Sequence, residues 1–231
     1  MFNVKNYGKM SRIINEITRQ DVISGVVQAG LEQIPYVNFF TSAVVNIKEN
    51  CLQRRFENWQ AMVGERLAKL EKEVFDALGE NETFATTLLK TTELASKSNA
   101  KKMEMLANAV KYVATNEIND DYLVIFLNCI DKYTISHLKL LKYFMNPRKY
   151  YVNNRVNYTL ISPLYLYKET YSISNDNNNL LNVIVNDLNT DGLLNADKLD
   201  MSIQFDSALL QRTTRMCDLF IEFFGILDVE L

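Results

Sequence analysis

Residues 187–198 place short oxygen-bearing side chains at the spacing of a calcium-binding loop. Asp187, Asn189 and Asp191 fall at positions 1, 3 and 5 of a loop of the EF-hand or dockerin kind, and Gly192 falls at position 6. Oxygen ligands at alternate positions wrap a hard cation, and the glycine makes the sharp turn that such a loop requires. This stretch is therefore the chain's one candidate metal site.

The twelfth position of this loop is unsuited to calcium. An EF-hand needs a bidentate carboxylate there, and this chain has Lys198. An exit helix is also needed, whereas Met201, Ile203 and Phe205 alternate as they would in a strand. The competing interpretation is an amphipathic helix that ends at Gly192. Its inward residues would be Leu181, Ile184, Val185 and Leu188. We favour the helix and expect no cofactor, calcium included.

Little in the chain suggests catalysis. The only histidine is His137, which excludes metal sites built on several histidines. A hydrolytic triad in this chain would have no histidine to use other than His137. The seven glycines are scattered, so no glycine-rich phosphate loop is present. On a predicted helix, beside Leu138, His137 is expected to be a surface or partly packed residue. We expect a protein that is not an enzyme, with a nuclease built only on carboxylates left open.

Basic residues and tyrosines are concentrated between residues 132 and 168. The stretch holds seven of the twelve tyrosines and no acidic residue. Its basic residues are Lys132, Lys139, Lys142, Arg148, Lys149, Arg155 and Lys168. Basic side chains with interleaved aromatic rings can neutralise phosphates and stack on bases. The candidates for nucleic-acid contact are Lys139, Lys142, Arg148, Lys149 and Arg155.

Acidic residues dominate the following stretch. Residues 176–206 contain six aspartates and a single basic residue, Lys198. The predicted helix over 180–191 is the one that would enter the DNA groove in a winged-helix protein, and its negative surroundings would repel DNA. The acidic face would then bind a protein or pack against the chain's own basic stretch. We expect a protein partner or self-association, with nucleic acid as the alternative.

The segment Val22–Ile47 is almost free of charge. Glycines and Pro35 divide it into two apolar halves, each shorter than the roughly 20 residues that cross a bilayer. A buried helical hairpin bent at Pro35 is the favoured interpretation. The alternative is insertion into a membrane by an effector, in which Val26, Phe39 and Phe40 would contact lipid or a partner.

Apolar residues that recur every three to four positions predict several helices. Asn119 and Thr134 are placed to cap two of them. The predicted helices cover 49–78, a segment from about 81, 100–113, 120–130, 134–145, 180–191 and a segment from 213 or 214. Strands are expected at 158–161, 164–167, 201–205 and 208–211.

The expected fold is mainly α. A helical bundle with the apolar N-terminal hairpin would cover residues 1–117, and a winged-helix-like α+β module with a short β-hairpin would cover 118–231. Cys51, Cys129 and Cys217 are widely spaced and odd in number, which favours buried reduced thiols and a cytoplasmic protein. No secretory signal is evident, since residues 1–11 are polar and mixed.

Three segments resemble a recurrent bacterial layout. They are Leu106–Val110, Asp120–Phe126 and His137–Phe144. Their apolar spacing is similar to that of the Abi-alpha family of abortive-infection proteins, over about residues 100–145. The resemblance includes no catalytic residue, and it implies a role in bacterial defence against phage.

Overall fold

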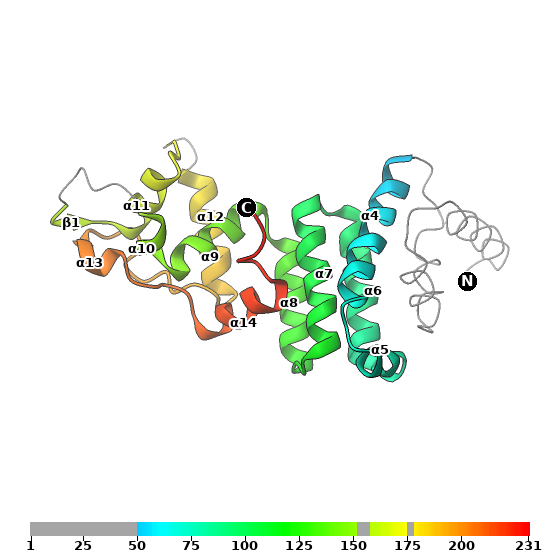
Figure 1. Ribbon diagram of the computed structural model, residues 1–231. Helices are drawn as coiled ribbons and strands as arrows, with labels where there is room; N and C mark the ends of the chain where they lie inside the picture. The colour runs from blue at the N-terminus through cyan, green and yellow to red at the C-terminus, as the bar shows by residue number, and fades with distance from the viewer. Residues whose placement is uncertain (1–49, 152–157, 175–177) are drawn as a thin grey trace. The chain divides into compact units, whose positions relative to one another are not determined.

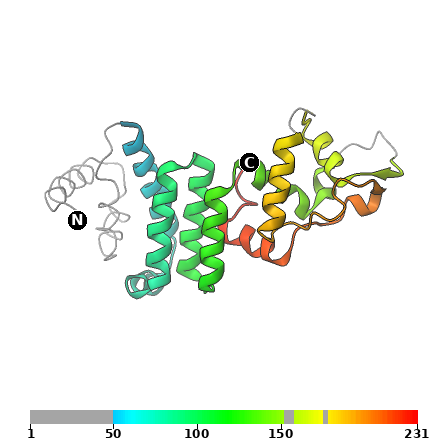
Figure 2. The same ribbon diagram turned by 180° about the vertical axis from the view of Figure 1, so that it is seen from behind.

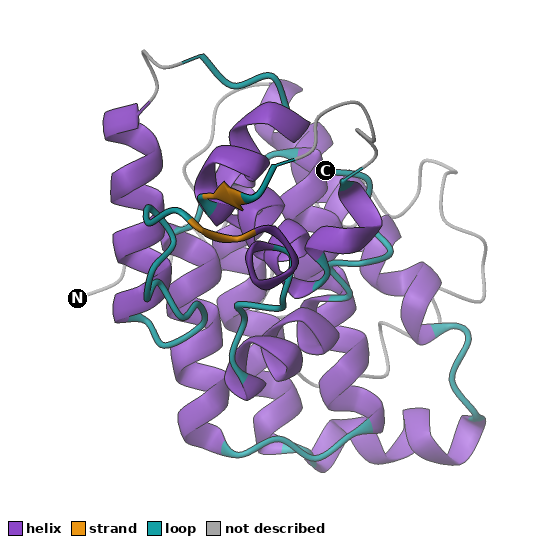
Figure 3. Ribbon diagram, turned by 90° about the vertical axis from the view of Figure 1, so that its left-hand side faces the viewer, coloured by secondary structure: helices purple, strands orange, loops and turns teal. Residues whose placement is uncertain are grey.

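A computed structural model describes residues 50–151, 158–174 and 178–231. These residues are mainly helical, as predicted, and their only strands form a small antiparallel pair (Figure 3). They form two compact units. The first unit runs to Asn128 and takes in Phe223–Gly225, and the second comprises Cys129–Glu222 and Ile226–Leu231. The apolar segment 22–47, with Val26, Phe39 and Phe40, lies outside the described residues, as does Arg155.

The first unit is built from helices that lie side by side (Figures 1 and 2). Its helix α6 packs along α7, and α4 packs against both. The elements are α4 (Asn50–Leu67), α5 (Lys72–Ala77), the 3-10 turn η1 (Leu78–Glu80), α6 (Glu82–Lys97), α7 (Ala100–Thr115) and the start of α8 (Asp120–Lys132). The predicted boundary between residues 117 and 118 lies in the loop before α8, whereas the units divide within α8.

One buried polar contact fixes α4 against α6. The indole Nε1 of Trp59 donates to Thr92 Oγ1 at 3.1 Å, and Thr92 Oγ1 donates to the Leu88 carbonyl at 2.7 Å. All three residues are buried, so the indole N–H gains the partner that a buried donor needs. The helix starts agree with their sequence signals, because Asn81, Asn99 and Asn119 each accept a backbone N–H with the side-chain oxygen.

The prediction of one continuous helix over 49–78 is wrong. The chain leaves the helix after Leu67, and Glu71 takes an extended conformation before α5 begins. The connecting residues include neither glycine nor proline, so no local signal marks the break. We attribute it to tertiary packing, since the turn allows α5 to pack on α7 and Leu78 to be buried.

The second unit combines short helices with the strand pair. After the end of α8, its elements are α9 (Ile135–Met145), α10 (Pro147–Tyr150), β1 (Leu160–Ile161), α11 (Pro163–Thr170), α12 (Asn178–Thr190), β2 (Ile203–Gln204), α13 (Phe205–Ala208) and most of α14 (Arg215–Phe224). Strand β1 pairs with β2, with Leu160 opposite Gln204 and Ile161 opposite Ile203.

The predicted β-hairpin over 201–211 is wrong. Strand β2 pairs with β1, which lies far away in sequence, and residues 205–208 form α13. Ala208 and Leu209 are buried with Ile161 and Leu166 in one apolar cluster. A continued extended strand would point these two neighbours in opposite directions, whereas a helical turn allows both to be buried.

The strand predicted at 164–167 is also wrong, because this segment belongs to α11. Ser162 Oγ accepts the Tyr165 N–H at 3.0 Å, and Pro163 occupies the first turn of the helix. Serine at the cap and proline in the first turn are a helix-start signal, which the apolar and aromatic composition of the segment obscured.

The helix interpretation of residues 180–191 is confirmed. Helix α12 buries all four predicted inward residues, and Gly192 follows it with φ +73°. The last helix also matches its prediction: Thr214 Oγ1 accepts the Cys217 N–H, and Phe220, Phe223 and Phe224 are buried. Burial is likewise confirmed for two of the thiols, since Cys129 and Cys217 are free and buried.

Two glycines with positive φ provide a matched test of the first unit's packing. A Cβ at Gly225 (φ +57°) would lie 2.6 Å from Asn108 Nδ2, an amide that also donates to the Phe224 carbonyl. A Cβ at Gly192 would meet only the flexible end of Met216, at 3.2 Å.

Gly192→Ala should therefore cost about 1 kcal/mol of unfolding free energy for the left-handed backbone. Gly225→Ala should cost about 2–4 kcal/mol, because it also disturbs the Asn108 hydrogen bonds. Urea denaturation of both variants measures the difference, and equal losses would contradict the Asn108 contact.

Candidate functional site

The residues of the candidate calcium loop belong to the end of α12 and the turn after it. Asp187 Oδ1 and Asp191 Oδ2 lie 3.1 and 2.9 Å from the ammonium of Lys132. Asn189 Oδ1 accepts the Ala196 N–H at 3.1 Å, so it supports the turn. Within the described ranges, no group of three or more histidine, cysteine, aspartate or glutamate side chains is arranged to hold a metal ion. The two carboxylates that suggested calcium instead contact a lysine.

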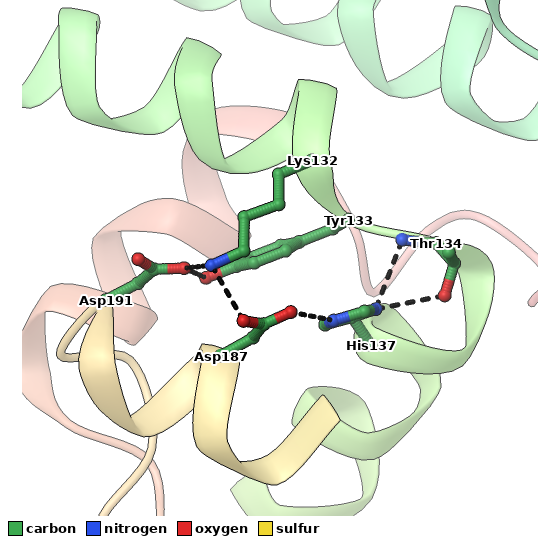
Figure 4. A network of polar contacts seen from close by, with 6 residues as sticks. All are labelled: Lys132, Tyr133, Thr134, His137, Asp187 and Asp191. Atoms are coloured by element: carbon green, nitrogen blue, oxygen red, sulfur yellow. Dashed lines mark hydrogen bonds and ion pairs between the residues drawn. The ribbon is translucent and has the colours of Figure 1, made fainter. Parts of the chain in front are cut away.

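These carboxylates belong to a polar network that joins the ends of α8 and α12 (Figure 4). Asp187 and Asp191 share one face of α12 because they are one helical turn apart. Lys132 lies in the last turn of α8, where the helix dipole favours a cation. The neighbouring Tyr133 is buried, and its hydroxyl donates to Asp191 Oδ2 at 2.7 Å. We call Lys132, Tyr133, Thr134, His137, Asp187 and Asp191 the α8–α12 network.

His137 lies at the centre of the α8–α12 network and is only 5% exposed. Its Nδ1 accepts the Thr134 N–H at 3.2 Å, which leaves the proton of the neutral ring on Nε2. Nε2 then donates to Asp187 Oδ2, at 3.3 Å. The Tyr133 ring stacks on the imidazole with 4.9 Å between centroids. The prediction of a surface or partly packed histidine is wrong, because this residue closes the cap of α9 from the inside.

The electrostatics of the network favour fixed protonation states near neutral pH. Burial lowers the pKa of His137, so the ring is neutral there. Burial, together with donation to Asp191, raises the pKa of the Tyr133 hydroxyl. The hydrogen bond from Lys132 lowers the pKa of Asp187, and the bond to Asp191 raises the pKa of Lys132. Both imidazole nitrogens are engaged, so the arrangement is suited to holding helices together.

Two of the basic residues that we proposed for nucleic acid have partners within the second unit. Lys142 Nζ donates to the carbonyls of Ile226, Leu227 and Val229 at 3.4, 3.1 and 2.9 Å. Arg148 Nη2 donates to Asp206 Oδ1 at 2.9 Å. The ammonium of Lys142 thus holds the end of the chain, while Arg148 joins an exposed ion pair.

Two other candidates, Lys139 and Lys149, are more accessible to a nucleic-acid ligand. Lys139 is half-buried on α9, and Lys149 is exposed with its Nζ 5.8 Å from the centroid of the Tyr150 ring. Tyr133, Tyr143 and Tyr167 are buried, so their rings have no free face for a base. The structure therefore brings together only a fraction of the predicted basic, aromatic surface.

The acidic and basic stretches neutralise each other in part. Asp187, Asp191 and Asp206 come from the acidic stretch, and each is paired with Lys132 or Arg148 from the basic stretch. The charge pattern allowed the acidic stretch either to bind a protein or to pack against the basic stretch, and these ion pairs are contacts of the second kind.

A surface that the sequence analysis did not identify lies on α8. Tyr122, Val124 and Ile125 expose 39, 44 and 40% of their surfaces. Val124 also borders a pocket of about 220 Å³ in the first unit, whose lining residues are Glu82, Thr83, Thr86, Asp120, Leu123 and Val124. The signal was present in the sequence: residues 122–127 are all apolar or aromatic, and one helix face cannot bury a continuous run. We call Tyr122, Val124, Ile125 and the adjoining pocket the α8 surface.

Comparison of the chain with models of known protein families, with curated proteins and with solved structures finds no match. No helix among the described residues has the length and apolar character needed to cross a bilayer.

The buried histidine predicts how stability depends on pH. The folded-state pKa of His137 lies below the ordinary value of 6.5, so the unfolded chain binds this proton first. Stability should therefore fall as pH drops from about 6.5 towards the folded-state pKa. His137→Gln should remove this part of the fall, because glutamine at the third helical position can still accept the Thr134 N–H.

Melting temperatures of both proteins between about pH 7.5 and 5 measure the effect. The charged neighbours Asp187, Asp191 and Lys132 are present in both proteins, so the comparison isolates the imidazole. An equal or steeper fall in the His137→Gln protein would contradict the histidine's assigned state.

Proposed function

We propose that this chain is a non-enzymatic protein-interaction module that binds its partner on the α8 surface. The supporting observation is that three large apolar side chains of one helix, Tyr122, Val124 and Ile125, are exposed, and that Val124 also lines a pocket. Grouped apolar exposure on a folded protein marks interaction sites, whereas single exposed apolar residues are ordinary.

The charges around the α8 surface select the kind of partner. Glu82 and Asp120 line the pocket, and Glu80, Glu117 and Asp121 are exposed in the adjoining turns and helix start. An acidic rim beside apolar side chains suits a segment that has apolar residues on one face and Lys or Arg on the other. Two copies of the α8 surface placed face to face would instead bring like charges together. The partner that we propose is therefore a basic amphipathic helix.

Nucleic-acid binding by residues 132–168 is the alternative function. Lys139 and Lys149 support it, while the internal partners of Lys132, Lys142 and Arg148 weaken it. Retention of random DNA at low salt that is lost on Lys139→Glu and Lys149→Glu would favour this alternative.

We also propose three further features, which concern the biological role, the fold of the second unit and membrane activity. The resemblance to Abi-alpha proteins suggests that the module acts in bacterial phage defence. The order α9, β1, α11, α12, β2 and α14 suggests a winged-helix-like second unit. A membrane-active role would depend on residues 22–47, outside the described ranges.

Selection from a random peptide library tests the proposed function. Peptides that bind the full chain should carry apolar residues at helical spacing together with Lys or Arg. Val124→Asp should weaken their binding about tenfold or more, because it places a charge within an apolar contact. The matched control is Val183→Asp, at an apolar position of α12 that is 55% exposed. Peptides that bind the Val124→Asp protein as tightly as the unchanged chain would refute the α8 surface as the binding site.

A further inference from the structure

The N-terminal cap of α9 depends on the protonation state of its histidine (Figure 4). In the neutral ring, His137 Nδ1 carries the lone pair that accepts the Thr134 N–H at 3.2 Å, and the Thr134 hydroxyl lies 2.9 Å from the same nitrogen. Protonation of the imidazole places a hydrogen on Nδ1. Two donors, the Thr134 N–H and the new Nδ1–H, would then point at each other. The cap in this form therefore exists only while the ring is neutral.

The other contacts of the ring respond to protonation in the opposite sense. Nε2 lies 3.3 Å from Asp187 Oδ2, and a charged imidazole donates to a carboxylate more strongly than a neutral one does. The Tyr133 ring is stacked on the imidazole with 10° between their planes, and the face of a tyrosine attracts a cation. Protonation of His137 thus strengthens its contacts with Tyr133 and α12, while it removes a hydrogen bond at the start of α9.

We propose that His137 is an acid-sensitive switch that exchanges the N-cap of α9 for an ion pair with α12. In the neutral state the ring holds the first turn of α9. In the charged state it holds Asp187 and releases the Thr134 N–H. The consequence is a local opening of the junction between α8 and α9, over residues 133–137, while the rest of the second unit stays folded. The switch uses none of the residues of the α8 surface, so it is independent of the proposed partner.

The charged groups around the ring set the pH at which it switches. Asp187 and Asp191 of α12 favour the charged ring, and Lys132 of α8 opposes it. Burial is the largest effect and lowers the pKa of His137, so the exchange should take place below pH 6.5, the ordinary value for histidine. The hydrogen bond from Lys132 lowers the pKa of Asp187, so this carboxylate is still charged when the ring gains its proton.

NMR spectroscopy of the full chain between about pH 7.5 and 5 tests this exchange. His137 is the chain's only histidine, so its ring nitrogen signals are identified directly. As they report protonation, the protection factor of the Thr134 amide against hydrogen exchange should fall about fivefold, the scale of one lost N-cap. The Cys217 amide is the matched control in the same unit. It donates to the Thr214 hydroxyl, a cap that does not titrate, and should keep its protection.

Two variants identify the groups that act in the switch. His137→Gln keeps an acceptor for the Thr134 N–H at every pH, so its Thr134 protection should not change over this range. Asp187→Asn removes a carboxylate that favours the charged ring, so the midpoint of the titration should move to lower pH. Thr134 protection that does not follow the titration of His137 would overturn the proposal. A parallel loss of Cys217 protection would overturn it as well, because unfolding of the whole unit would then account for the change.

Discussion

The contact of Lys132 with Asp187 and Asp191 is the interaction on which the second unit depends. It joins the end of α8 to the end of α12, and Tyr133 and His137 complete their hydrogen bonds through the same two carboxylates. Without the ammonium, two carboxylates one turn apart would repel each other beside a buried tyrosine. The cap of α9 belongs to the same network, since His137 bonds both Asp187 and the Thr134 N–H.

This internal use of charge also shapes the functional proposal. A basic, tyrosine-rich stretch is a reasonable candidate for binding nucleic acid, yet Lys132 and Lys142 hold parts of their own unit together. Among the described residues of the first unit, the large apolar side chains that are exposed lie instead on α8, where the nearby charges are acidic. These exposed apolar side chains and the acidic residues near them favour a protein ligand with basic side chains.

Short-range sequence signals were sufficient to predict where several helices begin and which of their residues are buried. Asn81 and Asn99 cap their helices, and the inward residues of α12 follow the helical period. The break after Leu67 and the pairing of β1 with β2 depend on packing between distant segments, which periodicity does not encode. The network was hidden for the same reason. Asp187 and Asp191 carry the spacing of a calcium loop, and only the position of Lys132 in space decides otherwise.

A double-mutant cycle between Lys132 and Asp191 tests the central claim most directly. Lys132→Met removes the charge, and Asp191→Asn keeps an oxygen that can accept the Tyr133 hydroxyl. The account predicts a coupling free energy of about 1 kcal/mol after allowance for solvent screening. The exposed pair of Arg148 and Asp206 should give a value near zero in the parallel cycle. A coupling between Lys132 and Asp191 that is no larger than that of the exposed pair would contradict the account.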